Sequence, residues 1–115
     1  MSASIDLLPD FKRRLKRLSR KFRTLPDEIE KLLDSLEDNP SQGKSLRAGL
    51  YKIRLGSVSR GGGKRGGFRV ITYYVEQTAD GETVYLVTIY DKSEEASIGK
   101  DELLDQLRRE LPPAT

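Results

Sequence analysis

The spacing of apolar residues changes twice along this 115-residue chain, and the two changes set the order of its secondary structure. Up to residue 36, apolar residues recur every three or four positions, which is typical of helices that bury one face. From Leu50 to Tyr90 they alternate with polar residues or form short β-branched and aromatic runs, which are typical of strands. Helical spacing returns at Leu103. This order predicts one α+β domain, residues 1–115, because a chain of this length supports a single modest core.

Two helices are expected before the strands. Apolar stripes over residues 11–22 and 25–36 predict them, and Thr24 with Pro26 marks the start of the second. The sequence DNPSQG, residues 38–43, ends that helix because the residue before a proline avoids the helical conformation. The short connection makes the pair a helical hairpin, and each helix needs a partner surface for its stripe.

Three main strands are expected to form a small antiparallel sheet under this hairpin. In residues 50–55 apolar side chains alternate with Lys52 and Arg54, so one face is apolar and the other cationic. Residues 68–75 and 83–90 are apolar on both faces, which predicts central, covered strands. A short edge strand in the SASID segment and a C-terminal helix that carries the last leucines complete the predicted fold.

Composition excludes several kinds of chemistry. The chain has no cysteine and no histidine, so disulfides, thiolate nucleophiles and Ser-His-Asp triads are impossible, and neither a transition-metal site nor a cofactor is expected. No apolar run approaches about 18 residues, so no membrane span is expected. The first residues lack the order of a signal peptide, and a cytoplasmic location is expected.

Charge is strongly segregated along the chain. Residues 1–23 carry eight basic and two acidic residues, and residues 50–74 carry six basic and no acidic residues. One interpretation is that the two basic blocks form one surface that binds a polyanion. The alternative is that each block is an ordinary solvated face without a ligand. On the first helix, Lys12, Arg13 and Lys16 are candidate RNA-binding residues.

A glycine-rich loop, RGGGKRGG, lies between two predicted strands at residues 60–67. It contains the GxGxxG pattern, but a dinucleotide site needs a helix after the loop, and here a strand follows. The P-loop pattern is absent as well. It requires Ser or Thr directly after its lysine, and here Lys64 is followed by Arg65. The remaining interpretations are a solubilising hairpin loop and an RNA phosphate site.

The geometry of the strands favours the phosphate site. Lys52 and Arg54 share one face of a strand at a spacing of roughly 7 Å, which brackets a phosphate. The other candidates gather at the same end of the sheet: Arg60, Lys64 and Arg65 on the loop, Arg69 on the next strand, and Tyr90 and Lys92 at the end of the last strand. These residue types suit phosphodiester transfer in which the RNA's own 2′-hydroxyl attacks. The protein then has to accept a proton, neutralise charge and protonate the leaving oxygen.

Two segments carry a family resemblance: LYKIRLGSVSRGGGKRGGFRVITYYV, residues 50–75, and VYLVTIYDKSEEASI, residues 84–98. Together they resemble the RelE/ParE superfamily of bacterial toxins, near the RelE/HigB branch, and the resemblance covers nearly the whole chain. It implies a helical hairpin on a curved antiparallel sheet. It also implies an mRNA endonuclease that works on the 70S ribosome and leaves a 2′,3′-cyclic phosphate. The implied partner is a cognate antitoxin, often of the helix-turn-helix type, and the basic first helix would dock ribosomal RNA or an acidic antitoxin segment.

The resemblance also implies residue roles. Lys52 and Arg54 match the strand residues that act as base and charge stabilisers, and Arg69 matches the arginine that opens the next strand. Lys92 matches a cation near the end of the last strand. Some members have a catalytic tyrosine further along the chain, and HigB members use a histidine. Both are absent here.

The role of general acid therefore stays open between Tyr90, Lys64 and Arg65, and Tyr90 could instead stack on a base. Three other functions stay open as well. A ParE-type protein poisons DNA gyrase and does not cut RNA, although that branch typically lacks the Lys52 and Arg54 pair. A plain nucleic-acid-binding module would bind phosphates without cleavage. A degenerate toxin would bind its antitoxin without activity.

Overall fold

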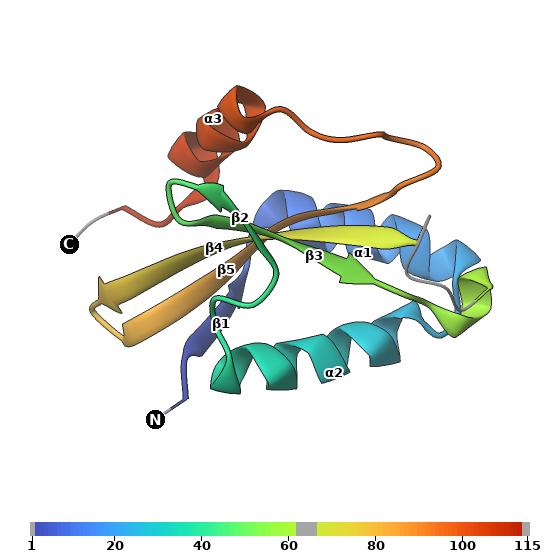
Figure 1. Cartoon of the computed structure of the whole chain (residues 1–115), viewed down its shortest axis with the longest axis horizontal. Coiled ribbons are helices and arrows are strands. Elements are labelled where there is room, and N and C mark those ends of the chain that lie inside the picture. The colour runs from blue at the N-terminus through green and yellow to red at the C-terminus, as the bar shows by residue number, and fades with distance from the viewer. Residues whose placement is uncertain (1, 62–66, 114–115) are drawn as a thin grey trace.

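The chain is described here by a computed structural model, which covers residues 2–61 and 67–113. In chain order its elements are β1 (Ser4–Leu7), α1 (Pro9–Lys21), α2 (Leu25–Asp38), β2 (Lys44–Arg47), β3 (Leu50–Leu55), the short 3-10 helix η1 (Val58–Arg60), β4 (Phe68–Thr78), β5 (Gly81–Asp91) and α3 (Lys100–Glu110). Figure 1 shows α3 on one side of the sheet and α2 on the other. The predicted α+β fold, with a helical hairpin before the main strands and a helix after them, is confirmed.

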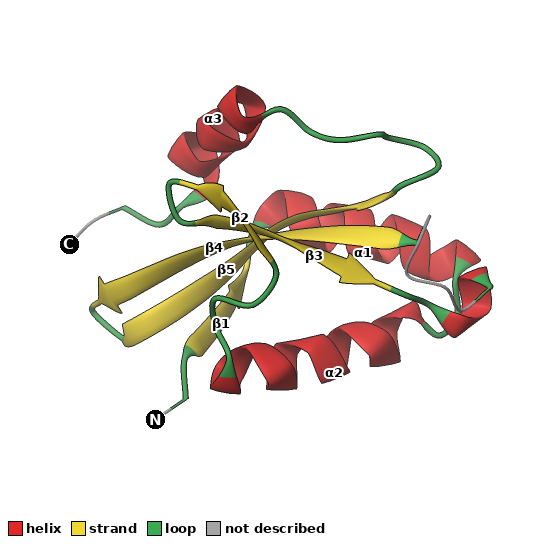
Figure 2. Ribbon diagram, viewed as in Figure 1, coloured by secondary structure: helices red, strands yellow, loops and turns green. Residues whose placement is uncertain are grey.

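The sheet differs from the prediction at its two edges. Its order is β1-β5-β4-β3-β2, and the three main strands are antiparallel as predicted, whereas the edge strand β1 pairs with β5 in parallel, so the sheet is mixed. The reason lies in the connection. Helices α1 and α2 carry the chain from β1 to the far edge, and the antiparallel run through β3, β4 and β5 returns it beside β1 (Figure 2). Strand β2 was not predicted, because its sequence, KSLR, does not alternate apolar and polar residues.

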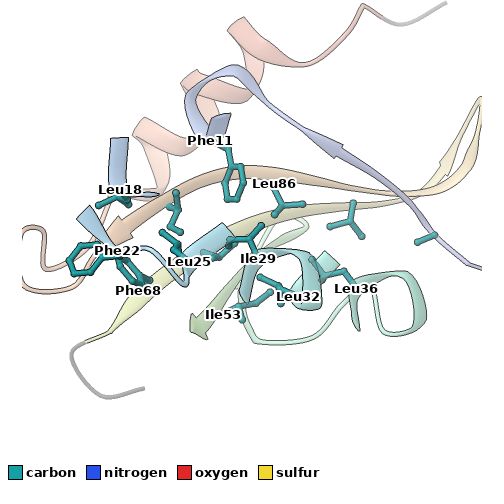
Figure 3. Close-up of a cluster of buried hydrophobic side chains, with 14 residues drawn as sticks. Phe11, Leu18, Phe22, Leu25, Ile29, Leu32, Leu36, Ile53, Phe68 and Leu86 are labelled. Carbon is teal, nitrogen blue, oxygen red and sulfur yellow. The ribbon is translucent and has the colours of Figure 1, made fainter. Parts of the chain in front are cut away.

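The larger core lies between the sheet and the first two helices. Phe11 of α1 and Leu25 of α2 are fully buried there, in one cluster with Phe68 of β4 and Leu86 of β5 (Figure 3). The rings of Phe22 and Phe68 meet edge to face, with centroids 5.1 Å apart. Burial of the two apolar stripes explains why short helices of modest intrinsic stability form here.

The smaller core lies on the opposite face of the sheet. Leu103 and Leu107 of α3 pack with Leu50 of β3 and Ile71 of β4. The side chain of Gln106, also on α3, donates a hydrogen bond of 2.8 Å to the carbonyl of Val87 on β5. Helix α3 therefore covers one end of this face and leaves the end near Arg54 and Arg69 without a helix above it. None of the helices described is both long enough and apolar enough to cross a membrane.

Candidate nucleic-acid interface

Five cations from four parts of the chain meet on the face of the sheet that α3 leaves open. Strand β3 turns Lys52 and Arg54 to this face, because Ile53 between them packs into the larger core. The strand register places Lys44 of β2 opposite Lys52, and Arg69 of β4 opposite Arg54. Lys92 follows directly after β5. We call Lys44, Lys52, Arg54, Arg69 and Lys92 the cationic face.

Lys52 lies at the electrostatic centre of the cationic face. Its pKa is lowered from the ordinary lysine value, first by partial burial and then by the positive charges of Lys44, Lys92, Arg69 and Arg54, in that order. A lowered pKa increases the fraction of Lys52 in the neutral amine form, and this form can accept a proton.

The exposed members of the cationic face are not neutralised by neighbouring carboxylates. Within the described part of the chain, Lys44, Lys52, Arg54 and Lys92 take part in no ion pair. The Nζ of Lys92 donates a hydrogen bond of 2.9 Å to the carbonyl of Ala96. Arg69 is only 5 % exposed and donates to the carbonyl of Phe68. Open like charges at this density favour binding of an anion.

Tyr90 lies beside Arg69 on the same face of the sheet, because the two residues pair across β4 and β5. It is 2 % exposed and packs in the smaller core. Burial raises the pKa of Tyr90, the charge of Arg69 opposes that rise, and the charge of Glu95 adds to it. The buried ring offers no free face for stacking on a base. Its position instead suits a support for the side chain of Arg69.

The glycine-rich loop is held at its base. The guanidinium of Arg60 donates two hydrogen bonds to the carboxylate of Asp91, at 3.0 and 2.7 Å, and Asp91 is 4 % exposed. Ser93 donates two further hydrogen bonds to the same carboxylate. The predicted RNA-binding residue Arg60 is thus engaged in an ion pair. The other two loop candidates, Lys64 and Arg65, lie outside the described residues.

The basic residues of α1 do not join the cationic face. Helix α1 packs on the opposite side of the sheet, and Lys12, Arg13 and Lys16 are exposed on its outer surface. Arg13 forms an ion pair with Asp10. The two cationic blocks of the sequence therefore form two separate surfaces, not one.

Lys44 is the site residue that the sequence did not reveal. It reaches the cationic face because Gly43 allows a close approach to β3. Gly43 has a φ of +99°, and a Cβ there would lie 2.7 Å from the carbonyl oxygen of Lys52. The adjacent Gly43-Lys44 pair was the available signal, but it stands in a segment without a recognisable strand pattern.

Comparison with known proteins identifies the family of this chain. A family model described as the ParE toxin of the type II toxin-antitoxin system parDE matches residues 5–96. The chain belongs to the ParE toxin family. Among solved structures, it resembles an arginine double mutant of the E. coli toxin RelE in the free state, with a TM-score of 0.61 and 18% sequence identity. The match covers 93% of this chain and 99% of that chain.

The predicted membership of the RelE/ParE superfamily is therefore confirmed, and so is the fold. A toxin of a type II module has a cognate antitoxin as its partner. At 18% identity, the likeness to RelE concerns the fold alone. What this toxin does must be argued from its own residues.

Proposed function

We propose that this toxin is an mRNA endonuclease that cleaves the phosphodiester by attack of the RNA's own 2′-hydroxyl. The observation that carries the proposal is the position of Lys52. Its amine has a pKa lowered by partial burial and by the charges of four other cations. The reaction requires a base and positive charges that stabilise the phosphate. Lys52 can serve as the base, and the neighbouring cations supply the charges.

The proposed reaction needs one base, one charge-stabilising group and one acid. The neutral amine of Lys52 accepts the proton of the 2′-hydroxyl while the 2′-oxygen forms a bond to phosphorus. Arg54 and Arg69 stabilise the additional negative charge on the phosphoryl oxygens. The bond from phosphorus to the 5′-oxygen then breaks, and that oxygen takes a proton. The products are a 2′,3′-cyclic phosphate and a 5′-hydroxyl.

We assign the leaving-group proton to Lys92. Its ammonium is exposed and close enough to depress the pKa of Lys52, whereas Tyr90 is buried and its pKa is raised. Tyr90 then acts by supporting Arg69 from its side and does not touch the RNA. The loop cations Arg60, Lys64 and Arg65 keep their proposed role in RNA binding. For Arg60 that role is indirect, through its ion pair with Asp91.

The two cationic surfaces support mRNA on the 70S ribosome as the substrate. The cationic face would hold the mRNA, while the exposed basic surface of α1, which includes Lys12, Arg13 and Lys16, would contact ribosomal RNA on the other side of the protein. Both surfaces are anion-binding by charge alone, so we expect binding to weaken steeply as salt rises. The same α1 surface is a candidate contact for acidic segments of the antitoxin.

The direct test is to incubate the purified toxin with mRNA, alone and with programmed 70S ribosomes, and to map the new 5′ ends by primer extension. We expect cuts on the ribosome, at least a hundredfold fewer with Lys52→Met or Arg54→Ala, and unchanged cutting with Lys100→Met. Lys100 is an exposed lysine at the start of α3 and lies outside the cationic face. Wild-type cutting by Lys52→Met would refute the assignment of the base.

A second candidate function is inhibition of DNA gyrase, which the match to the ParE family model favours. It predicts that the toxin blocks supercoiling by purified gyrase and leaves mRNA intact. The cationic face argues for the nuclease, because gyrase inhibition gives no role to a lysine with a depressed pKa. A supercoiling assay run beside the cleavage assay distinguishes the two functions.

A further inference from the structure

A groove runs around the open edge of β3, next to the cationic face. Strand β2 pairs with β3 only as far as Lys52, so Ile53 to Leu55 have no partner strand on that side within the described chain. Two hollows adjoin there, of about 420 and about 410 Å³. Both are lined by Gln42, Ile53 and Arg54, and the smaller one also by Lys44 and Lys52. The groove is thus continuous with the proposed phosphate site.

The larger hollow, which we call the edge groove, has apolar walls. Leu32 of α2, Ile53 and Leu55 of β3, and Val58 of η1 line it. Val58 is 76 % exposed and is the only large hydrophobic side chain classed as exposed in the described chain. The volume falls within the range of small-ligand pockets, and flat apolar walls suit the face of an aromatic ring.

One polar group in the edge groove has an unused acceptor. The Oε2 of Glu28 accepts hydrogen bonds from the backbone N–H of Val58, at 2.9 Å, and from the hydroxyl of Thr24, at 3.1 Å. Its Oε1 is buried and has no hydrogen-bond partner among the described residues. Buried acceptors are nearly always satisfied, by protein or by ordered water, so this oxygen is available to a water or to the N–H donor of a ligand.

We propose that the edge groove binds the nucleobase next to the scissile phosphate, and that Glu28 selects a base with an amino group. Adenine, cytosine and guanine each carry one, whereas uracil does not. The inference rests on the proposed nuclease function, because it takes the phosphate on the cationic face as its anchor. Leu55 lies three residues beyond Lys52, about 10 Å along the strand, within reach of an adjoining nucleotide.

RNA suits this groove better than an acidic peptide does. The cations that line it, Lys31 and Arg54, attract any polyanion, but the oxygen of Glu28 without a partner among the described residues needs a donor, which an acidic side chain lacks. An amino-bearing base supplies both the ring for the apolar walls and the donor for Glu28.

The test is an NMR titration of the ¹⁵N-labelled toxin with the four nucleoside 3′-monophosphates. The amides of Lys52 and Arg54 report on the phosphate, and the amide of Val58, which bonds Glu28 directly, reports on the base. We expect all four nucleotides to shift the first pair. The adenosine, cytidine and guanosine nucleotides should also shift Val58 and bind at least threefold more tightly than the uridine nucleotide.

Glu28→Gln supplies the specificity test. Its amide oxygen can still accept from Val58 and Thr24, so the fold is preserved, but its NH₂ group replaces the unused acceptor with a donor. We expect the preference against uridine to disappear or reverse, whereas the control Glu30→Gln, at an exposed position of α2, retains it. Equal affinity for all four nucleotides, shifts confined to Lys52 and Arg54, or a Val58 shift caused by hexaglutamate and by no nucleotide would each overturn the inference.

This outcome is separable from the nuclease test. Cleavage of mRNA without any base preference in the titration would leave the proposed function standing and remove the edge groove from it. The expected titration without any cleavage would support a base site in a protein that binds RNA but does not cut it.

Discussion

Replacing Lys52 with methionine should stabilise the toxin while it abolishes cleavage. Lys52 carries its charge among four other cations, and its lowered pKa means that the folded state holds this proton less firmly than the unfolded chain does. Below the folded pKa the charge therefore opposes folding. The penalty is relieved as pH rises through the folded pKa toward the ordinary value of 10.5.

The size of the effect follows from Coulomb's law. Two unit charges about 7 Å apart, the spacing of alternate strand residues, repel by about 0.6 kcal/mol at the dielectric constant of water. Lys44 directly opposite on β2 and three neighbours at other positions, screened by salt, give about 1 kcal/mol in total. For a domain of this size such a change raises Tm by about 4 °C.

The assay is thermal unfolding of Lys52→Met and wild type at pH 7, in low salt and in about 1 M salt, where screening acts within about 3 Å. We expect the gain in Tm at low salt and a smaller gain at high salt. Lys31→Met is the matched control, because Lys31 lies one helical turn from Asp27 and Asp34 and its removal should not stabilise. A Tm for Lys52→Met at or below that of wild type in low salt would refute the electrostatic reasoning.

Three further predictions concern other parts of the structure. Asp91→Ala leaves Arg60 without its partner and should cost about 2 kcal/mol, measured by urea unfolding. Burial alone would raise the pKa of Asp91, but hydrogen bonds from Arg60 and Ser93 lower it. Acid titration should therefore show that the stability difference between wild type and Asp91→Ala is present above the ordinary value of 3.8 and lost as pH falls through the lowered pKa. Gly43→Ala should cost about 1–3 kcal/mol and weaken RNA binding, because its φ of +99° and its contact with Lys52 exclude a Cβ; an unchanged urea midpoint would contradict this. Phe11→Ala, at a fully buried position, should cost about 3–5 kcal/mol in the same assay, and a cost below 1 kcal/mol would contradict the packing described.

Much of the fold could be predicted because its signals are local. The apolar stripes of α1 and α2 and the runs of β4 and β5 each lie within one element. Their burial, on one face of each helix and on both faces of each strand, is what makes each element form. The edges of the sheet could not be predicted in the same way. The direction of β1 depends on where the antiparallel run of β3, β4 and β5 ends. Strand β2 pairs through its backbone and has no apolar pattern of its own.

The candidate site was predictable only in part, for the same reason. Lys52 and Arg54 could be paired because strand alternation places them on one face. Arg60 and Asp91 are 31 residues apart, and their ion pair depends on the tertiary fold that brings η1 beside the end of β5. Tyr90 belongs to a run that is apolar on both faces, so its burial under α3 was a consequence of tertiary packing and not of its own sequence context.

The measurement that tests the central claim most directly is the chemistry of the cut end. An mRNA with a single 2′-deoxy substitution at a mapped cleavage position, and its unmodified counterpart, would be incubated with the toxin on programmed ribosomes across a range of pH, and the fragments analysed by mass spectrometry. We predict a 2′,3′-cyclic phosphate on the unmodified RNA, no cut at the substituted position, and a cleavage rate that rises with pH as Lys52 loses its proton. Cleavage of the 2′-deoxy substrate, or intact mRNA together with inhibited gyrase supercoiling, would contradict the account.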